Sequence, residues 1–494
     1  MDNYGFLSIL PPVIAIILAL RTKQVYVSLI AGIWLGWLII NDWNLLDGTI
    51  GTLEGFVNVF KSAGNTRTIM FSALVGSLLM FIQYSGGVQG FIIRINKILN
   101  RFDSKREGRS RVIVQLFAQL TGMLLFIETS ISSLTVGTLY RPVFDKLKIP
   151  REKLAYIADA TSAPSSILIP INAWGAFIMG LLITQGIENP LPTMASALML
   201  NFYPMLTILM VTLIIVTKKD FGPMAAAEKR TRDTGKVHND NAKPLISDEI
   251  TSLEMKEGIT PRSMNMVLPL LVMIFMMPVT LIYTGWGEVE HFSGLFDHMV
   301  KAIGKGSGSS AVLYSVTTSL VFAMILYRVQ GIMKTKKMVD LTLKGISELM
   351  PLALLMMLAF SISDVCNNLG TGNYVAHFTE GLIAPQYLPA LVFVISSFIA
   401  FSTGTSWGTF AIMISIVVPM AEIHGVNLYL IIAATLGGGV FGDHCSPISD
   451  TTIISSMASA SDHIDHVKTQ LPYALLVGTI TAVIYLVLGF VMES

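Results

Sequence analysis

The sequence predicts an all-α polytopic membrane protein, an inverted-topology repeat with two re-entrant helical hairpins and two broken transmembrane helices. Three observations lead to this fold class. Of the 494 residues, 53% are hydrophobic and only 13% are charged, which excludes an ordinary soluble domain. Apolar runs recur along the whole chain, and two of them are interrupted by polar residues. Lysine and arginine are distributed so that the two halves read alike in opposite orientations.

The apolar runs are expected to be helices, because backbone polar groups in lipid must be satisfied within their own segment. A simple crossing needs about 20 residues, so several of the runs have the wrong length for one span. The runs lie at about 6–20, 25–40, 68–84, 112–140, 153–185, 194–216, 264–284, 309–327, 348–365, 385–421, 428–458 and 471–492.

The run at about 112–140 is interrupted by the polar stretch 128–133. Arg111 precedes this run and Arg141 follows it, each among further basic residues. The positive-inside rule places both flanks in the cytoplasm. We therefore expect a re-entrant hairpin that enters from the cytoplasm and turns at 128–133.

The run at about 385–421 is interrupted in the same way by the polar stretch 402–409. No lysine or arginine occurs from Gly345 to Val467, so both flanks of this run are best placed outside the cell. We expect a second hairpin, which enters from the external side.

The remaining charges divide the chain into a first repeat at 1–216, a cytoplasmic linker at 217–262 and a second repeat at 263–494. Broken helices are expected at about 153–185 and 428–458. Each is the run that directly follows the hairpin of its repeat. Both termini are predicted to be external, and the start of the chain lacks the basic region of a cleavable signal peptide. Inverted repeats of this kind are the architecture of many secondary transporters.

A weak sequence echo supports the repeat. The segment 169–172, Ile-Pro-Ile-Asn, resembles 446–449, Ser-Pro-Ile-Ser. Pro142 and Pro419 occupy matching places after the two interruptions. Because proline and small residues recur by chance in such chains, the charge pattern is the stronger argument.

The stretch 437–452 carries the sharpest functional signal, Gly-Gly-Gly-Val-Phe-Gly-Asp-His-Cys-Ser-Pro-Ile-Ser-Asp-Thr-Thr. We expect its four glycines to loosen the backbone and Pro447 to break the helix. A carboxylate such as Asp443 is costly at bilayer depth unless it faces protein, water or an ion. A broken helix that carries carboxylates inside a membrane domain is typical of a site for a transported cation.

Candidate ion- or solute-binding residues lie at the two tips and the two breaks, which should converge near the midplane of the membrane. They supply the carboxylate, hydroxyl and amide oxygens that a hard cation such as Na⁺ prefers. The set comprises Glu128, Thr129, Ser130, Ser166, Asn172, Thr403, Thr405, Asp443, His444, Ser446, Asp450 and Thr451.

Each candidate also has a purely structural interpretation. A serine or threonine hydroxyl can bond back to its own helix. Asp450 can cap the helix that follows it, and His444 can be a hydrogen-bonded core residue as well as a proton relay. Trp174 and Trp407 can wall a cavity or simply pack.

Two further carboxylates lie outside this set. Asp159 is close in sequence to Arg151 and Lys153, which fits either a gating role or a surface ion pair. Asp364 leaves a similar ambiguity at the external end of its helix. Asp443, His444 and Cys445 also offer transition-metal ligands, but three adjacent residues of a regular helix cannot all point at one ion.

Residues 442–452 closely resemble the corresponding motif of the NhaC-type sodium/proton antiporter family, and 126–130, Phe-Ile-Glu-Thr-Ser, resembles the matching motif of the first half. The resemblance implies a bacterial inner-membrane antiporter of the wider ion transporter superfamily. Malate/lactate antiporters and carriers of amino acids are among the similar proteins. The resemblance points to ion handling at Asp443, Ser446, Asp450, Thr451 and Glu128, and our hypothesis for Na⁺ binding is Asp443, Asp450, Thr451 and Glu128.

We therefore expect a secondary active transporter, most simply a Na⁺/H⁺ antiporter that exchanges cytoplasmic Na⁺ for external H⁺ by alternating access. The alternative is a Na⁺- or H⁺-coupled carrier of a small organic acid or amino acid. A metal-dependent hydrolase and a channel are weaker competitors, and we expect no enzyme activity and no cofactor. The expected partners are membrane lipid, Na⁺, H⁺ and an organic solute under the alternative, with a homodimer left open and nucleic acid excluded.

Overall fold

The structure is a computed structural model that describes residues 4–22, 24–101, 107–126, 129–170, 172–244, 255–256, 258–289 and 294–492. All regular secondary structure in these residues is helical. Nine of the described helices are long and apolar enough to cross a membrane. The predicted all-α class is therefore confirmed for the described part of the chain.

The first half and the segment after it contain many helices that the apolar runs predict and some short ones that they miss. Their bounds are η1 (Gly5–Ile9), α1 (Leu10–Thr22), α2 (Val25–Ile40), α3 (Leu45–Val59), α4 (Ala63–Tyr84), α5 (Gly87–Arg101), α6 (Glu107–Leu124), α7 (Thr129–Lys146), α8 (Arg151–Ala160), α9 (Ala163–Ile167), α10 (Ala173–Thr184), α11 (Pro190–Met199), α12 (Phe202–Thr217) and α13 (Gly222–Thr234).

The second half has fewer and longer helices. Their bounds are α15 (Met264–Gly285), η2 (Trp286–Glu288), α16 (Leu295–Lys305), α17 (Gly308–Val329), α18 (Thr335–Leu369), α19 (Thr371–Thr379), η3 (Pro385–Tyr387), α20 (Leu388–Thr403), α21 (Ser406–His424), α22 (Leu428–Cys445), α23 (Asp450–Ala458) and α24 (His463–Val491).

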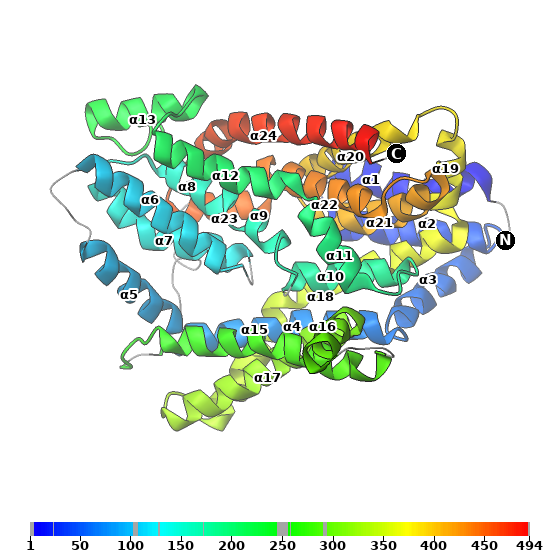
Figure 1. The fold of residues 1–494 in the computed structure, drawn as a ribbon, viewed down its shortest axis with the longest axis horizontal. Coiled ribbons are helices and arrows are strands. Elements are labelled where there is room, and N and C mark those ends of the chain that lie inside the picture. Colours follow the sequence, from blue (N-terminus) through cyan, green and yellow to red (C-terminus); the bar gives the residue numbers. More distant parts are fainter. Residues whose placement is uncertain are drawn as a thin grey trace.

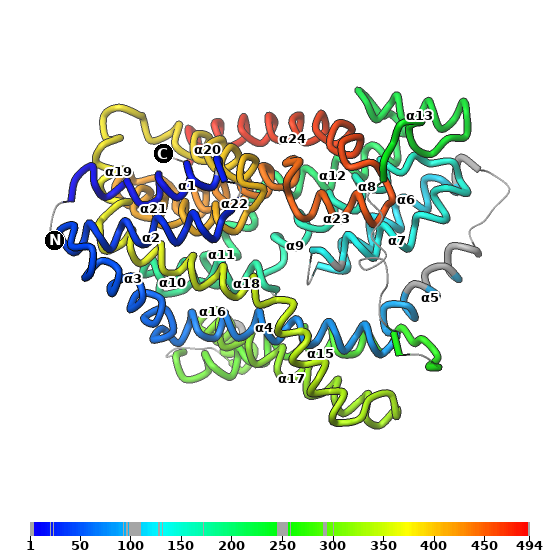
Figure 2. The backbone as a smooth tube through the Cα atoms, turned by 180° about the vertical axis from the view of Figure 1, so that it is seen from behind, coloured from blue at the N-terminus to red at the C-terminus, as the bar shows by residue number. Residues whose placement is uncertain are grey.

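The long helices lie in layers along the longest axis of the molecule. In Figure 1, α24 and α12 lie along one face, α4, α15 and α17 along the opposite face, and α21 and α22 between them, and Figure 2 shows the same order from behind. The two chain ends marked N and C lie toward one end of this axis, and α13 lies at the other.

Helices α6 and α7 pack together and form a helical hairpin. Arg111, near the start of α6, contacts Glu228 at 2.5 Å, and Glu228 contacts Lys153, just beyond the end of α7, at 3.0 Å. The outer ends of the pair are therefore close together. The predicted interruption at 128–133 is placed too late, because α7 already begins at Thr129 and Ser132 donates from Oγ to the carbonyl of Gly122 in α6 at 3.0 Å.

Helices α20 and α21 form a second hairpin around a shorter interruption than the predicted 402–409. Gly404 has a φ of +69°, which permits the sharp turn between the two helices. At the outer end of α21, His424 contacts the carbonyl of Ala376 at 2.8 Å, and Ala376 lies in α19, just before α20. Both outer ends of this pair are again close together.

Two helices are broken where the sequence predicts breaks. Helix α22 ends at Cys445 and α23 begins at Asp450. Pro447 lacks an N–H group and holds Ser446 in an extended conformation, with ψ at 132°. In the first half the break is double, between α8 and α9 and between α9 and α10.

The glycines before Asp443 do not loosen the backbone as predicted. Gly437, Gly438, Gly439 and Gly442 all lie inside the regular helix α22 and are buried. An added Cβ at Gly442 would collide with the carbonyl of Ser397, and one at Gly438 with that of Phe393. These glycines therefore let α22 approach α20 at backbone contact distance, which a larger residue would prevent.

The segment after α12 is not only a solvated linker. Helix α13 buries Glu228, which pairs with Arg111 and Lys153, and Arg230 pairs with Glu152 at 3.0 Å. Five charged side chains of α6, α8 and α13 thus fix this helix against the first half.

Contacts between helices recur in pairs, in which helices of the two halves of the chain change places. Helix α1 packs on α2 as α15 packs on α17, α2 packs on α18 as α17 packs on α4, and α6 packs on α8 as α20 packs on α22. Helices α4 and α18 cross at Gly76 and Gly345, where a Cβ on either glycine would overlap the backbone of the other helix. Pro142 and Pro419 each lie thirteen positions after the first residue of α7 and α21.

Candidate functional site

Asp443 is buried at the end of α22, beside the start of α21. Its side chain is 3% exposed. Ser406, the first residue of α21, donates to Asp443 Oδ2 from its backbone N at 3.1 Å and from its Oγ at 2.5 Å. The carboxylate therefore lies at a helix N-terminus, whose unpaired N–H groups and dipole favour negative charge. Asp443 Oδ1 has no protein partner within the described residues.

A cavity of about 380 Å³ separates the tips of the two hairpins. Its walls come from the start of α7, the turn between α20 and α21, the break before α23, and the scaffold helices α2 and α18. The residues of the predicted set that line it are Thr129, Ser130, Thr403, Thr405 and Asp450. The predicted convergence of tips and a break is therefore present around one cavity.

Asp450 is the carboxylate of the predicted set that lines this cavity. It opens α23, and its Oδ1 accepts a hydrogen bond from the backbone N of Thr451 at 2.8 Å. Asp443 and Asp450 are near enough to interact electrostatically. Thr451 is buried, and its Oγ1 pairs with Ser449 Oγ at 3.0 Å. Two acidic side chains thus flank the break, one in the cavity wall and one behind it.

Trp174 and Trp407 form an aromatic wall of the cavity. Their ring centroids are 5.1 Å apart, and both residues line the cavity. Phe177 packs against Trp407 with centroids 5.0 Å apart. The sequence left open whether these tryptophans wall a cavity or simply pack, and in the structure they do both.

Asn172 holds the first hairpin to its neighbouring break. Its Nδ2 donates to the carbonyls of Phe126 at 2.9 Å and Ser166 at 2.7 Å, and its Oδ1 accepts from Gly175 N at 3.1 Å. The side-chain amide therefore caps the start of α10 and holds the segment after α6 and the end of α9 together. The Ser166 hydroxyl is fully buried and has no protein partner among the described residues.

Ser446 does for the second hairpin what Asn172 does for the first. Its Oγ donates to the carbonyl of Phe401 at 2.7 Å. The hydroxyl of Thr403 donates to the carbonyl of Ile399 in its own helix at 2.8 Å. Thr405 Oγ1 accepts from Trp407 N at 3.3 Å. The structural interpretation therefore holds for the hydroxyl hydrogens of Ser446 and Thr403, while Thr403 and Thr405 still line the cavity.

His444 points away from the cavity into a second buried polar region. Its Nδ1 is 2.8 Å from the hydroxyl of Tyr203. Its carbonyl accepts from Nε2 of Gln470, and the same Nε2 donates to Asp159 Oδ2 at 2.8 Å. Asp159 is fully buried and contacts His466, which excludes the surface ion pair, one of the two alternatives that the sequence left open for it. Those two basic residues pair instead with Asp145, Asp220 and Glu228.

Two further predictions about this site concern Glu128 and a metal site. Glu128 lies outside the described residues, so its place relative to Asp443 stays a prediction. Within the described part, no three histidine, cysteine, aspartate or glutamate side chains are grouped to hold a metal ion. Cys445 Sγ instead lies 3.0 Å from the carbonyl of Phe441 in its own helix.

Sequence reasoning missed the contribution of the scaffold to the cavity. Tyr26 lines it, and its hydroxyl donates to the carbonyl of Pro351 at 3.0 Å. Gln24 and Glu348 also line it. No local motif marks these residues, because they reach the cavity only through the packing of α2 and α18.

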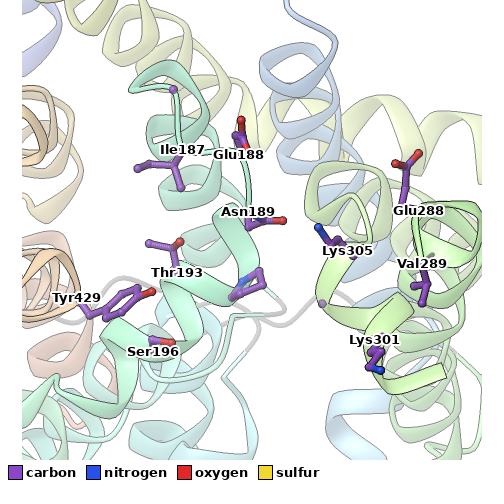
Figure 3. Close-up of a pocket in the computed structure, with 13 residues that line it drawn as sticks. Ile187, Glu188, Asn189, Thr193, Ser196, Glu288, Val289, Lys301, Lys305 and Tyr429 are labelled. Carbon is purple, nitrogen blue, oxygen red and sulfur yellow. The ribbon is translucent and has the colours of Figure 1, made fainter. Parts of the chain in front are cut away.

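A larger cavity of about 950 Å³ lies elsewhere, and none of the predicted site residues lines it. Figure 3 shows Glu188, Asn189 and Thr193 on one side of it, and Lys305 and Glu288 on the other. It contains neither helix break, so it is not the candidate site.

The model of the Na⁺/H⁺ antiporter family matches residues 176–490, more than half of the chain. The chain belongs to this antiporter family. The match covers Asp443, Asp450 and the second hairpin, so the resemblance seen at 442–452 is confirmed. With the nine apolar helices, family membership makes the protein a multi-pass membrane transporter.

Relatives of this family member include proteins with named cargoes. An uncharacterized protein of Haemophilus influenzae is 34% identical over 98% of this chain and 91% of its own length. The malate-2H⁺/Na⁺-lactate antiporter of Bacillus subtilis is 35% identical over 22% of this chain and 23% of its own. The arginine/ornithine antiporter ArcD of Halobacterium salinarum is 31% identical over 25% of this chain and 26% of its own.

Solved transporter structures share the fold of this antiporter-family chain. The YdaH transporter of Alcanivorax borkumensis superposes with a TM-score of 0.57 at 16% identity, over 90% of this chain and 89% of its own. Neisseria gonorrhoeae MtrF, from a class described as antimetabolite efflux pumps, gives a TM-score of 0.54 at 16% identity, over 89% and 84%.

Proposed function

We propose that the protein is a secondary active transporter that exchanges cytoplasmic Na⁺ for external H⁺, with Asp443 and Asp450 as the cation-binding carboxylates. One observation carries the proposal. Asp443 is buried with one oxygen held by Ser406 and the other without a protein partner among the described residues, beside a cavity that Asp450 lines. A buried carboxylate is costly unless it is protonated or bound to a cation, so it can alternate between the two.

The oxygen atoms around this position suit Na⁺ as a cargo. Asp443 and Asp450 supply carboxylates, and Thr129, Ser130 and Thr403 supply hydroxyl oxygens to the cavity wall. Hydroxyls that donate to their own helix still present lone pairs to a cation. Glu128 of the first tip and Thr451 belong to the same proposed set.

The repeated contacts favour alternating access as the mechanism. Each hairpin is tied to a broken helix by a hydrogen bond to a phenylalanine carbonyl, from Asn172 to Phe126 and from Ser446 to Phe401. We propose that these hairpins and broken helices move together against a scaffold that contains α2, α4, α17 and α18. The recurrent packing of that scaffold supports the inverted-topology repeat, with both hairpins re-entrant.

The charge pattern supports one orientation in the membrane. Helix α13 and the basic residues around it lie at one end of the long axis, and both chain ends lie toward the other (Figure 1). We propose a bacterial inner membrane with the α13 end in the cytoplasm and both termini outside.

The direct test is transport by Asp443→Asn in proteoliposomes that contain a pH-sensitive dye. An amide has the shape of the carboxylate but cannot carry its charge or exchange its proton. We expect Na⁺-driven proton flux to fall at least about a hundredfold, because a buried cation site loses its charged ligand. Asp364→Asn, on α18 and outside the cavity lining, should keep wild-type flux.

Two results would contradict this function. Asp443→Asn that retains normal, pH-dependent exchange would remove the carboxylate from the mechanism. Wild-type protein that moves no protons in response to Na⁺ or Li⁺ between pH 6 and 9 would exclude Na⁺/H⁺ exchange as its activity.

A second candidate function follows from the size of the cavity. A volume of about 380 Å³ with two tryptophans in the wall exceeds what one Na⁺ ion occupies and is within the range of small-molecule sites. The named relatives include antiporters for malate and lactate and for arginine and ornithine. We therefore propose coupled transport of a small organic acid or amino acid as the alternative.

Thermal unfolding separates the two candidates. Malate, lactate and amino acids are screened with and without Na⁺. A Na⁺-dependent rise in Tm with one organic solute, lost in Trp407→Ala, supports the organic cargo. A rise with Na⁺ or Li⁺ alone, unchanged by every solute, supports simple Na⁺/H⁺ exchange.

A further inference from the structure

Five polar side chains meet behind the cation site, where the proposed exchange does not use them. Asp159, Tyr203, His444, His466 and Gln470 come from α8, α12, α22 and α24, and each is at most 1% exposed. The ionisable pair at the centre is Asp159 and His466, with Asp159 Oδ2 at 3.4 Å from His466 Nε2. This pair joins a helix of the first half to the last helix of the second.

The pair is incompletely hydrogen-bonded. Asp159 Oδ1, His466 Nδ1 and Gln470 Oε1 have no protein partner within the described residues. A partly satisfied buried network costs more than an apolar core would. A group of helices that keeps such a network near a transport site is a candidate for a functional role.

We propose that Asp159 and His466 form a proton-binding site that is separate from the cation site at Asp443 and Asp450. This inference rests on the proposed exchange of Na⁺ for H⁺ and names a second place, besides Asp443, where a proton is carried. During the transport cycle the pair takes up one proton on one side of the membrane and releases it on the other. Its net charge changes from −1, with a neutral imidazole, to zero when the imidazole is protonated beside the carboxylate.

The pair can communicate with the cation site through charge. The carboxylate of Asp159 is near enough to raise the energy of a negative charge on Asp450. When the pair gains a proton, the region becomes less negative and holds Na⁺ less tightly. Proton uptake by the pair then favours Na⁺ release through charge, in addition to the direct competition of the two ions at Asp443, and this is the sign that an antiporter needs.

One side chain links the two sites physically. Nε2 of Gln470 donates both to Asp159 Oδ2 and to the carbonyl of His444, the residue after Asp443. A change in the net charge of the pair therefore acts, through Gln470, on a hydrogen bond at the end of α22.

The pair is close to the polar segment after α13. His466 follows Asp465, whose Oδ2 accepts from Asn239 Nδ2 at 2.6 Å, and both lie in the first turn of α24. The pair therefore lies within one helical turn of the contact between α24 and this segment. The other titratable groups whose charges interact with Asp159 are Tyr203, His444, Cys445 and Asp450.

The test compares two transport assays on the same proteoliposomes. One is Na⁺-driven proton flux, read by a pH dye, and the other is exchange of ²²Na⁺ for Na⁺ at equal pH, which needs no net proton movement. For Asp159→Asn we expect proton flux to fall at least tenfold while Na⁺/Na⁺ exchange stays within threefold of wild type. The apparent Na⁺ affinity, read from Tm at pH 6 and pH 8.5, should lose most of its pH dependence.

His466→Gln and Asp364→Asn complete the design. His466→Gln keeps a hydrogen-bonding side chain without the titratable ring, and it should show the same split between assays, so it decides the matter if Asp159→Asn does not fold. Asp364→Asn, a half-buried carboxylate of α18, should leave both assays unchanged.

The outcomes separate this inference from the proposed function. Wild-type protein without Na⁺-dependent flux or exchange overturns the proposed function. Functional wild type with variants that keep proton flux within twofold, or that lose both activities together while folded, overturns only the separate proton site.

Discussion

The hydroxyl and the backbone N–H of Ser406 both donate to the same oxygen of Asp443. This arrangement fixes one side of the carboxylate and leaves Oδ1 toward a ligand. The first residue of α21 thus positions the acidic group of α22, although 37 residues separate them in the chain.

Ser406→Ala should weaken cation binding without abolishing transport. One hydrogen bond to a charged group, worth about 1.5–3 kcal/mol, is lost, while the backbone N–H remains. We expect the KM for Na⁺ to rise at least about tenfold with a smaller change in maximal rate. Rates are measured over a Na⁺ concentration series.

Ser415→Ala is the matched control, because its hydroxyl donates to Ile412 in the same helix α21 at 2.7 Å. Its KM should equal that of wild type. Equal KM values for Ser406→Ala and wild type would show that this hydroxyl does not support the cation site.

Sequence reasoning at this scale succeeded where a residue is conspicuous in its own segment. Asp443 stands out as a carboxylate in an apolar helix, and it is buried at the break. Ser406 and Gln470 gain their roles from partners in other helices, which no local pattern reveals. Asn172 belongs to the predicted binding set, and its side-chain amide also donates to backbone carbonyls of the first tip and break, which its local sequence does not reveal.

At the scale of the elements, α20 and α22 pack closely because glycines of α22 leave room for the backbone of α20. The backbone of α20 fills the space that a Cβ at Gly438 or Gly442 would occupy. The sequence shows these glycines, but their use as a packing surface depends on which helix approaches them. For the same reason the hairpins could be located from charge and polarity, while their turn residues could not.

Gly442→Ala should separate these two helices. The added methyl group overlaps the carbonyl of Ser397 and the backbone N of Phe401, and neither can move without shifting α20. Overpacking of this kind costs about 1–3 kcal/mol. We expect a lower Tm in detergent and reduced transport.

Gly304→Ala, in α16, provides the comparison, since no residue that the structure describes lies within 4 Å of its added Cβ. It should retain the wild-type Tm or exceed it slightly. A Gly442→Ala protein as stable as wild type would mean that α20 and α22 are not in backbone contact.

Asp462 joins the start of α24 to the segment after α13. Its carboxylate accepts from the backbone N of Ile464, Asp465 and Lys243. Partial burial raises its pKa, but the three hydrogen bonds outweigh that effect, so the pKa is lowered overall. A lowered pKa means that the stabilisation is present above the ordinary aspartate value and is lost as pH falls through the folded-state value.

Asp462→Ala should therefore lower stability by about 1 kcal/mol at neutral pH, the usual value of a helix cap. The difference from wild type should shrink below about pH 4, near the ordinary pKa of aspartate. Hydrogen exchange of residues 239–244 and thermal unfolding at both pH values measure this. Asp240→Ala, an exposed residue paired with Lys236, should show no such change, and a constant difference at all pH values would contradict the carboxylate cap.

For the whole molecule, the central cavity is expected to change its access during transport. Thr403 lies in its wall, whereas Cys366 and Cys445 are buried. In Thr403→Cys, a membrane-impermeant maleimide should label the new thiol from one side of the membrane. Replacing K⁺ by Na⁺ should change the labelling rate at least threefold, because Na⁺ shifts the population of states.

Wild-type protein, with its two buried thiols, gives the background of this experiment. A second variant, Ser459→Cys, replaces a fully buried residue and should stay unlabelled. Identical labelling of Thr403→Cys in K⁺ and Na⁺ would argue for a cavity that does not change its access.

At the crossing of α4 and α18 the backbones of Gly76 and Gly345 meet directly, and the side chain of Leu349 lies beside this contact. Because the two glycines have no side chains to change rotamer, the contact itself stores little energy as cargo binds and leaves. The work of each turnover must then be stored elsewhere, in the polar interior around the breaks. Turnover rate should accordingly be tuned by substitutions there, while changes at this pivot should affect only whether a working carrier is assembled at all.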